Sequence, residues 1–207
     1  MSILSCYAQN AFLNHVFENV SKKYDLMNDI MSFGVHRLWK DCFVSRIMPT
    51  DKLKYLDVAG GTGDIAFRLF KYAKHINGVP EVPNVKPLTD LDVTVCDISP
   101  SMMEVVSEAY RVLRPWGRFY CLEFSKVENN LFRNIYNAYS MQLIPVIGQL
   151  IAGDWNSYKY LVESIRQFPN QEEFAHIITQ SKFDGVNWIN YSNGIVSVHM
   201  GYKTPSK

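Results

Sequence analysis

The sequence predicts an α/β fold built on a parallel sheet, and two stretches of the chain support this prediction. Residues 53–64 read LKYLDVAGGTGD, so an apolar strand-like run stops at a glycine-rich turn before a helix-compatible run. Residues 91–98 read LDVTVCDI, a β-branched run that ends in an acid. A strand, a glycine-rich turn and a helix bring bare backbone close to a bound nucleotide at the carboxyl edge of an open sheet.

The spacing of the glycines indicates which nucleotide the turn accommodates. A dinucleotide fingerprint has the form G-x-G-x-x-G at the start of the helix. This turn instead has the form D-x-A-x-G-x-G, with Asp57 at its start and Gly60, Gly61 and Gly63 within it. Such a turn is typical of S-adenosylmethionine sites, where glycines let the chain turn tightly beneath the methionine and ribose. An ordinary glycine-rich surface loop is the alternative.

Asp97, at the end of the second predicted strand, is the other candidate for cofactor binding. An acid in this position accepts hydrogen bonds from ribose hydroxyls, because ligands of open sheets lie beyond the carboxyl ends of the strands. The alternative is a helix N-cap before Ser99-Pro100-Ser101, where proline at an early helical position is expected. The two roles are compatible.

Composition limits the remaining function classes. The 207 residues suffice for one domain with a substantial core, and a net charge of +1 without a basic stripe argues against nucleic-acid binding. The four cysteines and five histidines show no metal-ligand spacing, so no metal site is predicted. No segment reaches the roughly 18–20 apolar residues of a spanning helix. The first 14 residues lack Arg and Lys, so they do not form a convincing mitochondrial transit peptide.

Hydrophobic periodicity and turn residues predict the order of elements. Residues 10–48 are expected to be helical, since apolar side chains recur there at three- and four-residue steps. The elements expected after them are strand 53–58, helix 64–74, loop 75–90, strand 91–97, helix 101–113, strand 118–124, interrupted helix 129–152, helices 155–168 and 171–182, and strands 185–191 and 195–202. Asn193-Gly194 predicts a hairpin between the last two strands.

Several stretches also share a pattern with known enzymes. Residues 24–32 read YDLMNDIMS and are followed by His36 and Trp39, and residues 56–64 read LDVAGGTGD. Further matching stretches are RVL at 111–113, Pro115, Gly117, LEFS at 122–125, IAGDW at 151–155 and YLVESI at 160–165. Together they resemble the signatures of the ubiquinone/menaquinone-biosynthesis C-methyltransferase family over residues 15–203.

The resemblance implies a fold, a reaction and a set of site residues. The fold is the Rossmann-like class I S-adenosylmethionine-dependent methyltransferase fold, a seven-stranded, mostly parallel sheet with helices on both faces and a final antiparallel hairpin. The reaction moves a methyl group from S-adenosyl-L-methionine to a ring carbon of a polyprenylated benzoquinol in ubiquinone biosynthesis. Thr62 and Asp97 carry over as cofactor-binding residues, with Gly61 and Gly63 shaping the turn.

The resemblance also implies an organisation and a setting. Residues 1–48 would form a helical lid segment, with 24–32 over the cofactor, and 49–207 a methyltransferase-like α/β domain. An ordinary core-facing helix is the alternative for 24–32. The implied setting is the matrix side of the mitochondrial inner membrane, with a multi-subunit quinone-biosynthesis complex, a homodimer and peripheral membrane contact as candidate associations. The apolar segment 141–152 would admit a polyprenyl tail or touch a membrane surface, unless it is a core helix under the sheet.

One departure from the family pattern concerns the centre of the sheet. Residues 97–103 resemble the start of the helix after strand two, and 109–115 the end of the helix before strand five, so two strands and their helices are missing between them. The sheet is therefore expected to be short of two central-region strands. Either strand 53–58 pairs directly with strand 118–124, across a right-handed crossover by helix 101–113, or two rows of buried backbone groups go unpaired, which is very costly.

The missing segment also affects the functional hypotheses. The family keeps there the acid that contacts adenine and residues that face the substrate, so no catalytic residue is assigned. A catalytically impaired member that acts as a binding or scaffold subunit is therefore the alternative to an active methyltransferase. A nicotinamide-nucleotide domain is a third hypothesis, which the D-x-A-x-G-x-G spacing disfavours. Trp116 is a smaller departure, since the family has glycine there and a bulky side chain is unfavourable at positive φ.

Overall fold

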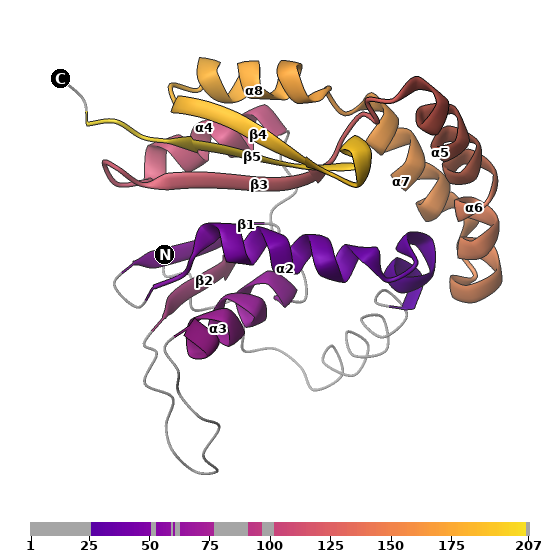
Figure 1. Cartoon of the computed structure of the whole chain (residues 1–207), viewed down its shortest axis with the longest axis horizontal. Coiled ribbons are helices and arrows are strands. Elements are labelled where there is room, and N and C mark those ends of the chain that lie inside the picture. Colours follow the sequence, from indigo (N-terminus) through magenta and orange to yellow (C-terminus); the bar gives the residue numbers. More distant parts are fainter. Residues whose placement is uncertain are drawn as a thin grey trace, which may run out of the picture.

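A computed structural model describes residues 26–50, 53–58, 60, 63–76, 91–96 and 102–205. Thr62, Gly61 and Asp97 lie outside the described residues, as does the stretch before residue 26. Residues 26–32 are helical, and the elements after them are α2 Val35–Ile47, β1 Lys54–Val58, α3 Asp64–Ile76, β2 Asp92–Cys96, α4 Met102–Val112, β3 Arg118–Phe124, α5 Asn130–Gln142, α6 Ile144–Ile147, η2 Gly148–Ala152, α7 Trp155–Gln167, α8 Gln171–Gln180, β4 Asp184–Tyr191, η3 Ser192–Gly194 and β5 Val196–Tyr202 (Figure 1).

The helices and strands predicted from residue 53 onward are confirmed to within a few residues, whereas the predicted loop 75–90 lies, from residue 77 on, outside the described residues. Local signals explain the accuracy. Asn170 and Glu173 form a reciprocal capping box at the start of α8. Asn193 and Gly194, both with positive φ, turn the chain between β4 and β5. The interrupted helix 129–152 consists of α5, α6 and the π-helical turn η2.

The described strands form two separate sheets. β1 and β2 pair in parallel, with Val58 opposite Cys96, and β5 lies between β3 and β4 in an antiparallel sheet. The two missing strands are thus confirmed for the described residues, which contain five. Direct pairing of β1 with β3 does not occur, so the less costly of the two expected arrangements is wrong.

Exposure of the unpaired edges explains why this arrangement is tolerated. Leu56, in the middle of β1, keeps 49% of its surface exposed, and the residues of β3 after Arg118 are only partly buried. Water can therefore reach β1 in particular, which lowers the cost of its unpaired backbone groups. Helix α4 does not cross over to join the sheets either. Val106 of α4 is fully buried in a cluster with Phe174, Ile178 and Phe183, so α4 packs beside α8 on the three-stranded sheet.

Helix α2 connects the two sheets on their other face. Phe43 and Val44 pack in one core cluster with Tyr55 of β1 and with Tyr120 and Leu122 of β3. The Phe43 and Tyr120 rings meet edge to face, with centroids 6.5 Å apart. A single helix therefore covers both sheets, and α3 lies beside it on the same face.

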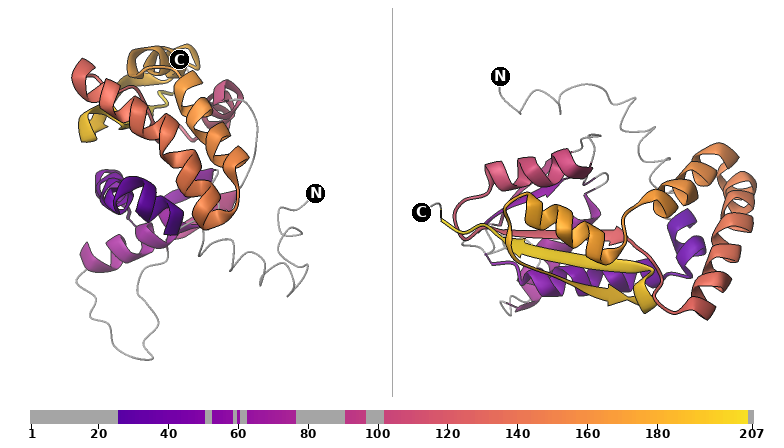
Figure 2. Two further views of the ribbon diagram at one scale, coloured as in Figure 1. Left: turned by 90° about the vertical axis from the view of Figure 1, so that its right-hand side faces the viewer. Right: turned by 90° about the horizontal axis from the view of Figure 1, so that it is seen from above.

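The course of α2 also sets the relative direction of β1 and β3. Near the start of α2, the Trp39 ring lies against Phe124 at the carboxyl end of β3, and Phe43, one turn later, lies against Tyr120. α2 therefore runs opposite to β3. A short connection turns the chain back from α2 into β1, so β1 runs in the same direction as β3. The carboxyl ends of β1, β2 and β3 thus lie on one side, where α5, α6 and α7 stack at one end of the molecule (Figures 1 and 2).

Candidate functional site

The turn after β1 is held against the end of β2. The backbone N–H of Gly60 donates to the carbonyl of Cys96 (3.2 Å), and Gly63 donates to Gly60 (2.7 Å). Gly63 has φ +77°, which suits glycine. A Cβ on Gly60 would lie 2.5 Å from Val95 Cγ1, so a side chain there requires the end of β2 to move. The loop therefore approaches the second strand closely, just before the position of Asp97.

Asp57 lies beneath this loop and carries an unsatisfied oxygen. Its Oδ2 is buried without a hydrogen-bond partner among the described residues, 3.0 Å from where a Gly60 Cβ would be. Burial raises the pKa of Asp57, and a hydrogen bond from the Ala66 backbone only partly opposes this. An unpartnered buried carboxylate oxygen is costly, and donors supplied by a loop or a ligand would satisfy it.

A network of charged residues joins the start of α3 to α2. Asp64, in the first turn of α3, accepts from Lys40 Nζ (2.7 Å) and from Arg68 Nε (2.9 Å). Burial alone would raise the pKa of Asp64, but Lys40 and Arg68 outweigh it and lower that pKa. Arg68 also binds the Asp41 carboxylate. Sequence reasoning missed this network, although Asp64 closes the quoted glycine motif.

Residues 26–36 carry the first family-like signature and serve two roles. Met27 is fully buried, so part of this segment belongs to the core. Ser32 and His36 form a polar pair, with Oγ and Nδ1 2.9 Å apart. Burial lowers the pKa of His36, and the charge of Lys40 acts in the same direction. The core interpretation is thus confirmed for Met27.

Contacts also place this segment near α5. Tyr139 of α5 donates from its hydroxyl to the carbonyl of Met31 (3.0 Å), and its ring lies 6.0 Å from that of Phe33. The segment therefore lies on the side of the carboxyl ends of the strands. Tyr24 and Asp25, the polar start of the predicted lid, lie outside the described residues. The lid role stays a prediction.

A pocket opens where β3 leads into α5. It has a volume of about 210 Å³ and is lined by residues of the β3–α5 connection, α5 and α7: Ser125, Lys126, Val127, Arg133, Tyr136, Asn137, Ser140, Val162, Ile165 and Arg166. The Ser125 hydroxyl is buried and has no partner among the described residues. Burial raises the pKa of Tyr136 to about 12, with Tyr139 adding to the effect. The pocket therefore offers hydroxyl and cationic donors beside apolar side chains.

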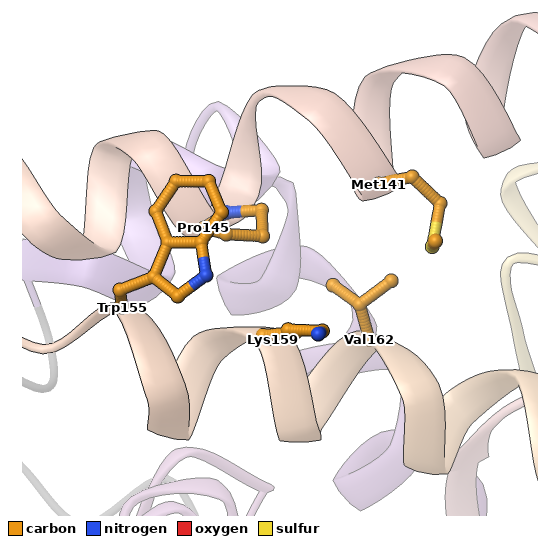
Figure 3. Close-up of a pocket in the computed structure, with 5 residues that line it drawn as sticks. All are labelled: Met141, Pro145, Trp155, Lys159 and Val162. Carbon is orange, nitrogen blue, oxygen red and sulfur yellow. The ribbon is translucent and has the colours of Figure 1, made fainter.

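The apolar segment 141–152 is divided between a buried and an exposed face. Ile144 and Pro145 are buried, whereas Leu143 and Leu150 keep 49% and 79% of their surfaces exposed. The buried side packs on α7, where a cavity of about 110 Å³ lies between Met141, Pro145, Trp155, Lys159 and Val162 (Figure 3). The segment is not a core helix under the sheet, because it packs on α7.

Metal and membrane features can be assessed for the described part of the chain. In those residues no three His, Cys, Asp or Glu side chains are grouped as a metal site would require. No helix there has the length and apolar character needed to cross a membrane.

The arrangement defines a class of protein. A glycine-rich loop closes on the end of a parallel neighbouring strand, helices flank the strands, and an antiparallel hairpin ends the sheet region. This is the Rossmann-like fold of S-adenosylmethionine-dependent methyltransferases. The model of the ubiE/COQ5 methyltransferase family matches residues 6–108 and 103–203, and the chain belongs to this family. S-adenosylmethionine is accordingly its methyl donor.

Curated relatives agree with this assignment. Proteins named 2-methoxy-6-polyprenyl-1,4-benzoquinol methylase, mitochondrial, from Oryza sativa subsp. japonica and Drosophila melanogaster are each 40% identical. The alignments cover 94% and 92% of this chain and 84% and 79% of those proteins. The Homo sapiens protein of the same name is 38% identical, over 91% of this chain and 78% of its own.

The comparisons also locate the shortened region. The alignment with the rice protein extends over 250 positions, more than the 207 residues of this chain. The rice protein therefore has residues that this chain lacks. The two matches to the family model meet at residues 103–108, within α4. The expected internal deletion is thus confirmed at the expected place.

Similarity to solved structures is weak. Human N-acetylserotonin methyltransferase in complex with SAM has a TM-score of 0.47 and 10% identity, over 95% of this chain and 60% of that one. PigF with SAH has a TM-score of 0.47 and 12% identity, over 94% and 63% of the two chains. The family assignment rests on the sequence matches.

Proposed function

We propose that this chain transfers a methyl group from S-adenosylmethionine to a ring carbon of a polyprenylated benzoquinol, as the names of its relatives suggest. The observation that carries the proposal is the 3.2 Å hydrogen bond from Gly60 to Cys96, which closes the glycine loop on the end of β2. Asp97 directly follows Cys96 and Thr62 lies within the loop. Both would therefore face one ligand at the same edge of the sheet.

The residues of the loop fit this cofactor. Gly60, Gly61 and Gly63 would leave room for it, Thr62 and Asp97 would bind it, and Asp57 would hold the loop from below. When bound, the cofactor supplies an electrophilic methyl group whose departure leaves a neutral thioether. The chain itself has to orient the two reactants and exclude water, because positioning contributes much of the rate in such a transfer.

The pocket between β3, α5 and α7 is the candidate site for the quinol ring. The hydroxyls of Ser125 and Tyr136 would donate hydrogen bonds to the oxygen substituents of the ring. The positive charges of Arg133 and Lys126 would stabilise a phenolate. An ionised phenol makes the neighbouring ring carbon more nucleophilic. No residue is assigned as the base that removes the phenolic proton.

A methyltransfer assay tests the reaction. The chain is incubated with S-adenosylmethionine carrying a labelled methyl group and a short-chain demethoxy-type benzoquinol, reduced in place. Transfer of label to the ring is the expected result, and it would exclude a purely scaffolding role. Binding of both compounds without any transfer would instead support the catalytically impaired binding or scaffold subunit.

Calorimetry tests the cofactor site separately. Asp97→Ala is expected to abolish binding of S-adenosylhomocysteine, because it removes the acceptor for the ribose hydroxyls. Gly60→Ala is expected to weaken binding at least tenfold, since its Cβ would meet Val95. Asp92→Ala, on the exposed first residue of β2, is the matched control and should bind like the wild type. Unchanged affinity in Asp97→Ala would remove that residue from the site, and competition by a nicotinamide nucleotide would indicate a different cofactor.

The cellular location of the chain and its association with a membrane or other subunits are also proposals. We further propose that the chain contacts the mitochondrial inner membrane from its matrix side, in a homodimer or a multi-subunit quinone-biosynthesis complex. Exposed apolar side chains in the stretch 131–150 support contact with a membrane surface. They are Leu131, Phe132, Ile135, Met141, Leu143, Val146 and Leu150.

Flotation with cardiolipin-containing liposomes tests this contact. The double variant Leu143→Glu/Leu150→Glu should lose association, whereas Leu38→Glu, exposed on α2, should retain it. Absence of association in the wild type would contradict the membrane contact.

A further inference from the structure

The two sheets leave one free edge each on strands that belong to the same molecule. β1 is paired on one side, with β2, and β3 on one side, with β5, and no other strand of the described residues pairs with either. β5, which has partners on both edges, is buried at five of its seven residues. β1 has no buried residue, and Leu56 at its centre is 49% exposed. The free edges thus retain surface that a fully paired strand buries.

The two free edges lie near one another and run in the same direction. Helix α2 contacts Tyr55 on β1 as well as Tyr120 and Leu122 on β3. A helix with its side chains is about 10–12 Å wide, so one helix can bridge only a narrow separation. A single strand between two others requires edges about 9–10 Å apart, twice the spacing of neighbouring strands. The neighbouring position of β1 and β3 is visible in Figure 1.

The comparisons indicate where along the chain relatives carry additional residues. The rice relative has residues that this chain lacks, and the two family matches meet within α4, between β2 and β3 in the chain. A segment inserted at that point would start after β2 and return before β3. It would therefore have access to the junction between the two sheets.

We propose that the junction between the free edges of β1 and β3 binds one extended apolar segment of another polypeptide, which pairs with both strands and joins the two sheets. Strand addition at an exposed edge is an established mode of peptide recognition, in which main-chain hydrogen bonds supply the affinity. A strand buried on both faces is apolar throughout, so the partner would be rich in Val, Ile and Leu.

A second copy of this chain fits the junction less well than an isolated segment. Each free-edge strand of a second copy is attached to its own neighbour, β1 to β2 and β3 to β5. Two paired strands are wider than the single strand that would have to hydrogen-bond to both β1 and β3. The proposal therefore names a lone extended segment, and self-association becomes an outcome that would contradict it.

Peptide binding tests the inference without cofactor or substrate. The probes are overlapping synthetic ten-residue peptides that span the segment present in the rice relative and missing here, titrated onto the whole chain by fluorescence anisotropy. One peptide is expected to bind with micromolar affinity. Hydrogen exchange should then slow at the amides of β1 and β3 and stay unchanged at β4. The same peptide with alternate backbone nitrogens methylated keeps its side chains but loses donors, and should bind at least tenfold more weakly.

Two variants of the chain complete the test. Leu56→Asp introduces a charge beside the inserted strand and should weaken peptide binding at least tenfold, while Leu38→Asp, exposed on α2, should leave it within twofold. The proposal is overturned if no peptide binds, if protection appears outside β1 and β3, or if those amides are already protected by self-association. Because none of these readouts involves methyl transfer, failure here is distinguishable from failure of the proposed enzymatic function.

Discussion

The β1–β2 sheet and the β3–β5–β4 sheet come from the same fold but differ in how completely they are supported. The three-stranded sheet has a strand paired on both edges and a sealed cluster in which Phe174 and Ile178 are fully buried. The two-stranded sheet relies on α2 and α3, and Leu56 on β1 is half exposed. Without the central strands, the β3–β5–β4 sheet is therefore stabilised by its own strand pairing and core, whereas the β1–β2 sheet depends on packing against α2 and α3.

The largest effect is expected in the sealed cluster. Phe174→Ala should lower the free energy of unfolding by about 3–5 kcal/mol, because a large buried side chain leaves a cavity. Phe67→Ala, whose ring on α3 is 72% exposed, is the matched control and should cost less than about 1 kcal/mol. Urea denaturation measures both. Equal losses of unfolding free energy in the two variants would mean that the two sheets do not differ in how much their cores stabilise them.

A pH dependence should come next in size. Burial raises the pKa of Glu123 on β3 to about 7, above its ordinary value of 4.5. Between these values the folded chain holds the Glu123 proton more tightly than the unfolded chain, so the contribution of Glu123 to stability is greatest below about pH 4.5 and is lost as the pH rises through 7. The contribution is on the order of 3 kcal/mol. Glu123→Gln should flatten this part of the profile of unfolding free energy against pH, and an unchanged profile would exclude Glu123 as its source.

The contact between α2 and the hairpin should contribute less. The Trp39 indole N–H donates to Ser192 Oγ (2.9 Å), so α2 is tied to the turn between β4 and β5. Trp39→Phe should lower the free energy of unfolding by about 1–2 kcal/mol, since it removes the donor and some packing. Ser192→Ala and the double variant complete a mutant cycle. A coupling energy near zero would show that this hydrogen bond does not join the two sides.

The smallest effect is expected at Trp116. Its φ is +67°, which confirms the unfavourable conformation expected there, and its ring stacks on Tyr202 at 6.4 Å. Positive φ costs a non-glycine residue on the order of 1 kcal/mol. Trp116→Gly relieves this strain but loses the stacking. The free energy of unfolding, measured by thermal denaturation, should therefore change by less than about 1 kcal/mol in either direction. A larger loss would show that the ring is a main support of this sheet end.

Much of the fold could be predicted because its signals are local. The strand predicted at 118–124 has the same bounds as β3, Asn170 with Glu173 marks the start of α8, and Asn193-Gly194 marks the hairpin. The glycine loop and Asp97 were predicted as neighbours, and the bond from Gly60 to Cys96 brings their flanks together. The pocket beside Ser125 could not be predicted, because it depends on how α7 packs against α5 and the β3–α5 connection.

The sequence alone determined the type and order of the elements, the family and the position of the missing strands, because these depend on residue spacing along the chain. Only the tertiary structure decided what happens at the missing centre. Long-range packing holds Val106 of α4 beside Phe174 and lays Phe43 of α2 over both sheets, so β1 and β3 stay unpaired. Backbone pairing is decided by how helices pack from opposite ends of the chain, and no local pattern encodes that balance.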